Sequence, residues 1–126
     1  MKNFGMKSTG ISIPEKTYIS IEGKLKYAEG NLWGTMMGPF GGCFAVRKSL
    51  FSKVPDNFLV DDFFINMKVL ENGHSCLNEP NAIVYEDVSN NLRAEFIRKS
   101  RISAGNFQNL AHFFHLLFKF NRLSFV

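Results

Sequence analysis

Apolar residues recur at helical spacing in three parts of this chain. The first predicted helix has Pro14 in its first turn and ends near Gly30. The second begins at Asp61 and stops at Asn72-Gly73, a pair that favours a helix C-terminus. The two apolar stripes consist of Tyr18, Ile21, Leu25 and Ala28, and of Phe64, Met67, Val69 and Leu70.

A third, longer helix and several short apolar segments complete the pattern. The helix is expected from about Asn91 to Phe118, with Gly105 as the place for an interruption. The short segments are bounded by Gly, Pro, Asn and Asp, which is typical of strands between turns. Strands are therefore expected at residues 43–46, 74–77 and 82–85. Helices alternating with strands predict an α/β fold, although there are too few strands for a complete nucleotide-binding sheet.

Length and charge narrow the class of protein. The chain has 126 residues, 45% of them hydrophobic, and can form one packed domain. Its formal charge is +4, but residues 92–126 carry a net +5 and residues 1–91 a net −1. Partners of negative charge are therefore expected at the C-terminal helix.

The cysteines and the N-terminus indicate a cytoplasmic setting. Cys43 and Cys76 lie in apolar surroundings and are expected to be buried free thiols. The first residues lack the apolar core of a signal peptide, and no run of eighteen apolar residues exists. His74, His112 and His115 have no spacing that predicts a metal site.

Two adjacent carboxylates, Asp61 and Asp62, open the second predicted helix. Backbone N–H groups and the helix dipole favour the ionised form of both at this position. An ionised carboxylate can accept a proton from a sugar hydroxyl as that hydroxyl attacks an anomeric carbon. The alternative is that the pair only caps the helix and is solvated.

One face of the long helix combines cations with small and amide side chains. At 100° per residue, four residues fall within an arc of about 80°. They are Arg98, Arg101, Gly105 and Gln108, while Leu92, Phe96, Phe107 and Leu110 fall on the opposite side. Guanidinium groups match phosphate oxygens, so this face could hold a diphosphate. The alternative is an ordinary amphipathic helix with a solvated basic face.

Four segments together resemble the C-terminal half of a family 2 glycosyltransferase of GT-A fold, from about Tyr18 to the C-terminus. They read GGCFAVRK at 41–48, VDDFF at 60–64, EPNAIVYE at 79–86 and RKSRI at 98–102. The resemblance implies a partial GT-A (Rossmann-like) α/β domain with short strands and a long C-terminal amphipathic helix. Residues 1–17 would be a loose lead-in, 18–106 the domain, and 107–126 a Phe-rich helix that can lie in a membrane interface.

The resemblance also implies roles for single residues. Asp62 aligns with the catalytic base of inverting family members, and Asp61 with a supporting acid. The loop formed by Gly41, Gly42 and Cys43 would lie under the acceptor sugar, where glycine lets a ligand approach the backbone.

The segment at 98–102 is similar to a Gln-x-x-Arg-Trp motif. Arg101 aligns with the motif's arginine, which contacts the nucleotide diphosphate. Arg98 replaces the glutamine and Ile102 the tryptophan. Because that tryptophan supports the acceptor sugar in polymer synthases, processive transfer and the acceptor stay open.

The implied activity is inverting transfer of a sugar from a nucleotide-sugar donor to a carbohydrate or lipid-linked acceptor, at the inner face of the cell membrane. The complete enzyme would use a divalent cation, Mg²⁺ or Mn²⁺. This chain has no Asp-x-Asp motif for that cation and lacks the N-terminal nucleotide-binding half. We therefore expect little or no transferase activity from this chain alone.

Two non-catalytic alternatives remain. One is a module that binds anionic lipid or nucleic acid through the basic helix. Nucleic acid is disfavoured because the acid pairs Asp61-Asp62 and Glu86-Asp87 would repel its phosphates. The other is a scaffold descended from the enzyme.

Overall fold

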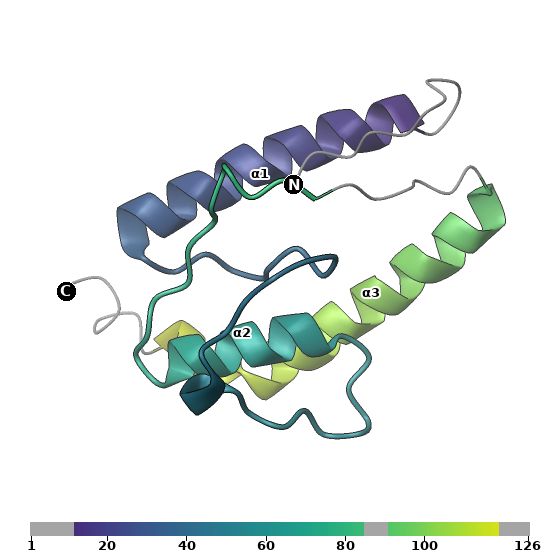
Figure 1. The fold of residues 1–126 in the computed structure, drawn as a ribbon. Helices are drawn as coiled ribbons and strands as arrows, with labels where there is room; N and C mark the ends of the chain where they lie inside the picture. Colours follow the sequence, from purple (N-terminus) through teal and green to yellow (C-terminus); the bar gives the residue numbers. More distant parts are fainter. Residues whose placement is uncertain (1–11, 85–90, 119–126) are drawn as a thin grey trace.

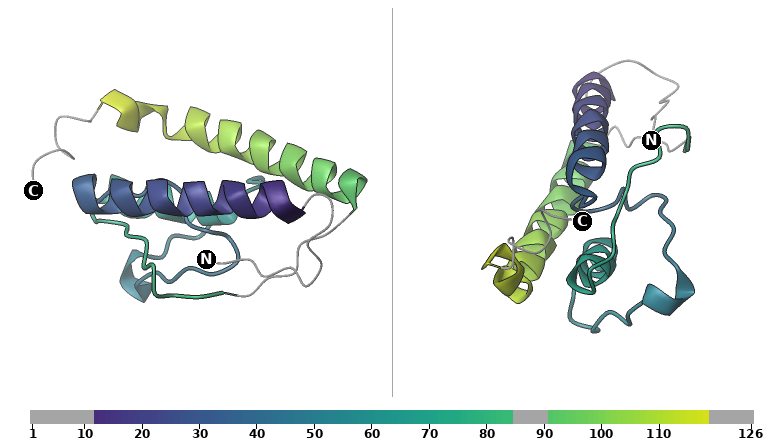
Figure 2. Two further views of the ribbon diagram at one scale, coloured as in Figure 1. Left: turned by 90° about the horizontal axis from the view of Figure 1, so that it is seen from above. Right: turned by 90° about the vertical axis from the view of Figure 1, so that its left-hand side faces the viewer.

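The computed structural model describes residues 12–84 and 91–118, and these residues are mainly helical (Figure 1). The elements are α1 (Ser12–Trp33), the 3-10 helix η1 (Lys48–Leu50), α2 (Asp61–Glu71), α3 (Leu92–His112) and the 3-10 helix η2 (Phe114–Phe118). The two long helices, α1 and α3, run in the same general direction (Figure 2). Irregular segments connect α1 to α2.

The local signals around α2 act as the sequence predicted. Val60 is the extended residue before the helix, and Asp61 and Asp62 form its first turn. At the other end the Gly73 N–H donates to the Leu70 carbonyl at 2.9 Å, and the His74 N–H donates to the Val69 carbonyl at 3.2 Å. This is the Schellman arrangement, and Gly73 adopts the positive φ of 77° that it requires.

The hydrophobic core lies between α2 and the C-terminal end of α3. Its buried members are Phe64, Met67, Leu70, Phe113 and Leu116. Phe58, from the segment before α2, packs edge-on against Phe64 with ring centroids 4.7 Å apart. The first half of α3 extends beyond this core, so most of its side chains are exposed.

The predicted α/β fold, and with it the partial GT-A (Rossmann-like) domain, is wrong. Residues 12–84 and 91–118 contain no sheet, and their β-pairing is one isolated parallel bridge between Thr35 and Cys76. The predicted strands at 43–46 and 82–84 are not paired, and Tyr85 lies outside the described residues. A strand is stable only where a neighbouring strand pairs with its backbone groups, and the described residues provide no such neighbour for these two segments.

The predicted helices exist with shifted ends. α1 extends three residues beyond the expected Gly30, and its stripe residues Ile21 and Leu25 are exposed. α3 continues through Gly105 without interruption and ends at His112. The 3-10 helix η2 follows from Phe114. Within the described part of the chain, no helix is long and apolar enough to cross a membrane.

Candidate functional site

The predicted cationic face of α3 holds the segment that leads into α2. Arg101 donates from Nη1 to the Leu59 carbonyl at 3.0 Å. Gln108 brackets the same segment, because its Nε2 donates to the Asn57 carbonyl at 2.7 Å and its Oε1 accepts from the Leu59 N–H at 3.1 Å. Residues 57–60 are therefore fixed by side chains of α3, and the two predicted carboxylates follow directly.

At Gly105, α3 comes into close contact with this segment. A Cβ at Gly105 would collide with the side chain of Val60. One turn later, Asn109 is fully buried and donates to the Val60 carbonyl at 3.2 Å. Gly105 and Gln108 thus have an intramolecular role that the sequence did not predict, while contact with a diphosphate stays a prediction.

Asp62 is half-buried at the start of α2, whereas Asp61 is exposed. The Phe63 N–H donates to Oδ1 of Asp62 at 2.7 Å, and the Asp62 N–H donates to Oδ1 of Asp61 at 2.9 Å. Burial raises the pKa of Asp62 above its ordinary value, and the charge of Asp61 adds to the rise. The bond from Phe63 and the charge of Lys26 act in the opposite direction but do not cancel it.

The expectation that the helix start favours ionised Asp62 is therefore wrong in its net direction. The backbone bond is present and lowers the pKa, as predicted, but desolvation outweighs it. A carboxylate with a raised pKa is the stronger base, so this change suits proton acceptance.

The predicted acceptor loop lies directly against Asp62. A Cβ at Gly41 would collide with Oδ2 of the Asp62 carboxylate, so a larger residue there would require the Asp62 side chain to shift. The loop turns here, with the Cys43 N–H donating to the Phe40 carbonyl at 3.1 Å, and residues 41–43 are exposed. Gly41 and Asp62, which are distant in sequence, thus form one surface.

Arg98 has a different neighbour from Arg101. It forms a two-pronged contact with Glu95 on its own helix, at 3.0 Å from Nε and 2.9 Å from Nη2. Arg101 is exposed, and a guanidinium has five donors, so its bond to Leu59 leaves others available.

A cavity of ≈ 720 Å³ lies beside the acceptor loop. Its walls come from residues 43–47, residues 74–79 and one face of α2, and Cys43 is the predicted substrate residue that contributes to it. Cys43 is exposed, contrary to expectation, and Cys76 is half-buried. Burial raises the pKa of the Cys76 thiol to about 11, so this thiol is unreactive at neutral pH.

The histidines take part in packing and surface contacts. His115 Nε2 lies 2.7 Å from Glu71 Oε1, and His112 packs against the Phe58 ring with centroids 5.4 Å apart. Among the residues that the structure describes, no three His, Cys, Asp or Glu side chains gather as a metal site. Glu86 and Asp87 lie outside the described residues.

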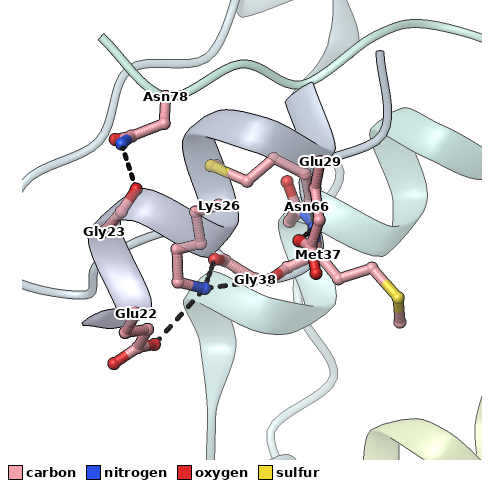
Figure 3. A network of polar contacts seen from close by, with 9 residues as sticks. Glu22, Gly23, Lys26, Glu29, Met37, Gly38, Asn66 and Asn78 are labelled. Carbon is pink, nitrogen blue, oxygen red and sulfur yellow. Dashed lines mark hydrogen bonds and ion pairs between the residues drawn. The ribbon is translucent and has the colours of Figure 1, made fainter. Parts of the chain in front are cut away.

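Sequence reasoning missed two buried polar residues of this region, Asn109 and Lys26. Asn109 was within reach, since it lies four residues after Gly105 on the same face of α3. Lys26 gave no signal, because nothing in its helix indicates that the ammonium group is buried and bonded to a distant loop (Figure 3).

Comparison with family models, with curated proteins and with solved structures finds no match to this chain.

Proposed function

We propose that this chain carries the acceptor side of a nucleotide-sugar-dependent glycosyltransferase, with Asp62 as the catalytic base. The observation that carries the proposal is the half-buried Asp62 carboxylate facing the exposed loop at Gly41. A base for this reaction must be poised at a surface that a hydroxyl can reach, and its raised pKa favours taking the proton.

In the proposed reaction an acceptor hydroxyl lies on the exposed surface that the Gly41–Cys43 loop and Asp62 form together. The hydroxyl oxygen attacks the anomeric carbon of the donor sugar while its proton passes to the Asp62 carboxylate. The bond from the anomeric carbon to the diphosphate breaks, and the nucleoside diphosphate leaves with the electron pair. Attack opposite to the leaving group inverts the anomeric configuration.

Arg101 is the proposed contact for the leaving diphosphate. Its exposed guanidinium is tied to Leu59, three residues before Asp62, so base and cation are attached to one short segment. Arg98 is proposed as the weaker contributor, because Glu95 already occupies two of its donors. The nucleotide and its divalent cation, Mg²⁺ or Mn²⁺, are assigned to a further polypeptide segment, since residues 1–126 contain no Asp-x-Asp motif.

Calorimetric titration with UDP and GDP, with and without Mn²⁺, tests the diphosphate contact. We expect weak binding by the folded chain that Arg101→Ala reduces by about tenfold, as for a lost charge-assisted hydrogen bond. Arg93→Ala, an exposed cation of the same helix, is the control and should bind as the unchanged protein does. Equal binding by both variants would contradict the role of Arg101, and no binding by a folded chain would place the whole donor site elsewhere.

A membrane surface is the second proposed partner. Leu92, Phe96 and Phe107 on α3 are 72%, 72% and 71% exposed. Their stripe is accompanied by the exposed cations Arg93 and Lys99, a combination that favours an anionic lipid surface. The same stripe supports the alternative of a non-catalytic lipid-binding module, which would bind vesicles but not the nucleotide.

A further inference from the structure

Lys26 is a buried cation that lies where α1 meets the loop at residues 37–40. The residue lies on α1 and is only 7% exposed. Its Nζ donates to the Met37 carbonyl at 2.9 Å and also to the Gly38 carbonyl (Figure 3). A lysine is rarely buried to this extent unless its charge has partners, so the arrangement requires an explanation.

The partners of Lys26 come mainly from the loop that carries the acceptor residues. Besides the two carbonyls, the ammonium lies 5.4 Å from the centroid of the Phe40 ring. Its carboxylate partner is Glu22, one turn earlier on α1, at 3.4 Å. Contacts from Met37, Gly38 and Phe40 thus converge on one nitrogen and attach this part of the loop to α1.

Two further polar contacts hold the same loop. Glu29 accepts from the Met37 N–H at 3.3 Å, and Asn66 on α2 donates to the Met36 carbonyl at 3.1 Å (Figure 3). These contacts attach the start of the loop to α1 and α2. Lys26 contacts the part of the loop that directly precedes Gly41, and Gly41 in turn meets Asp62.

Lys26 also acts on Asp62 through its charge. Among the described residues, two charged groups influence this carboxylate: Asp61 on its own helix and Lys26 on α1. The charge of Asp61 disfavours ionised Asp62, whereas that of Lys26 favours it. Because Lys26 is buried and Asp62 is half-buried, water screens their interaction less than it would screen one between two exposed charges.

We propose that Lys26 is a positioning residue for Asp62: it anchors the 37–40 loop so that Gly41 meets the carboxylate, and its charge favours the ionised form of that carboxylate, which is the form that accepts a proton. This role rests on the proposed function for its catalytic meaning, but the coupling of Lys26 to Asp62 can be measured without any transfer. Lys26 does not itself touch an acceptor in this arrangement.

Carbon-13 NMR of the Asp62 carboxyl across a pH titration tests the coupling in the full chain. In Lys26→Met the pKa of Asp62 should rise, because the favourable charge is gone. Lys26→Arg keeps the charge and should restore most of the original titration. Lys24→Met, which removes an exposed cation from the same helix, should leave the titration unchanged.

Amide hydrogen exchange separates the two parts of the proposal. The Met36 and Met37 N–H groups, which are hydrogen-bonded, should exchange roughly tenfold faster in Lys26→Met, since two carbonyl contacts of the loop are lost. Faster exchange with an unchanged Asp62 titration would mean that Lys26 only supports the loop, and the proposal would be overturned.

A reciprocal measurement covers the case in which Lys26→Met does not fold. With Glu22→Gln present throughout, so that the ion-pair partner of Lys26 cannot contribute, the Lys26 Cε resonance should follow the titration of Asp62, and adding Asp62→Asn should abolish this inflection. Its persistence in Asp62→Asn would overturn the proposal. The proposed function is tested separately, in an active enzyme that contains this chain together with the segment that binds the nucleotide. If Asp62→Asn leaves sugar transfer by that enzyme intact while the coupling of Lys26 to Asp62 is found, the proposed function fails and the coupling stands.

Discussion

Asp62 illustrates how burial can reverse the effect of a residue's position in a helix. Its place at the start of α2 was predictable from the sequence, and its bond from the Phe63 N–H follows from that place. Its burial was not predictable, because it depends on a loop twenty residues earlier that folds against it at Gly41. The net pKa shift therefore has the opposite sign to the one that local reasoning gives.

Asp62→Asn should remove a pH-dependent cost to stability. The pKa of Asp62 is higher in the folded than in the unfolded protein, so its contribution is most favourable below the ordinary value of 3.8 and is lost as pH rises through the folded pKa. Relative to the unchanged protein, Asp62→Asn should gain stability between acid and neutral pH in urea unfolding. Asp61→Asn, at the exposed neighbour, is the control, and an equal gain there would contradict the assignment to burial.

Glu71 should show the opposite dependence on pH. Its pKa is lowered, first by the hydrogen bond from Lys68 at 2.6 Å and also by the contact with His115. The stabilisation is thus present above the ordinary value of 4.5 and is lost as pH falls through the folded pKa. Glu71→Gln should lower the free energy of unfolding by about 0.5–1 kcal/mol at neutral pH, and the deficit should disappear as pH falls through the folded pKa. A deficit that persists in acid would indicate lost packing in place of lost charge.

At the scale of elements, the helices were predictable and the strands were not. The period of α2, its acidic first turn and its Gly73 end are all encoded within a dozen residues. A strand depends on a partner that local sequence does not specify. Cys76 pairs with Thr35 in an isolated bridge, whereas residues 43–46 form no β-pairing with any described residue and line the cavity.

The candidate site, like the fold, was predictable where its residues share one helix and not where it depends on contacts between distant segments. The shared face of Arg101, Gly105 and Gln108 followed from helical geometry, and these residues do act together. Their common contact, the segment at 57–60, comes from about fifty residues earlier and could not be deduced from spacing.

Two glycines inside helices should respond to alanine with opposite signs. Alanine is favoured over glycine in a helix by about 1 kcal/mol. Gly23→Ala on α1 meets no atom within 4 Å and should stabilise the protein by about that amount. Gly105→Ala on α3 would overlap Val60 and should destabilise it by about 1–3 kcal/mol, because α3 must move away from the segment before α2. Chemical denaturation of both variants measures the difference, and stabilisation by Gly105→Ala would refute the close approach.

At the scale of the whole molecule, the core and the exposed apolar surface lie at different places. The buried residues gather where α2 meets the end of α3. The first half of α3 extends beyond α2 (Figure 1). Large apolar side chains of this half are exposed. Aromatic side chains exposed along one stripe favour contact with another phase or partner. The flanking cations make an anionic surface the best match.

The full chain should therefore bind vesicles of phosphatidylcholine with phosphatidylglycerol more tightly than vesicles of phosphatidylcholine alone. The double change Phe96→Ser and Phe107→Ser should weaken binding by roughly tenfold, since two rings would no longer enter the lipid. Neither ring belongs to the core, so the far-ultraviolet circular dichroism should stay unchanged. The matched control is Leu32→Ser with Leu77→Ser, two exposed residues away from α3, and it should bind normally. If salt abolishes binding while the Phe double variant binds as the unchanged protein does, the cations alone make the contact and the apolar stripe has another partner.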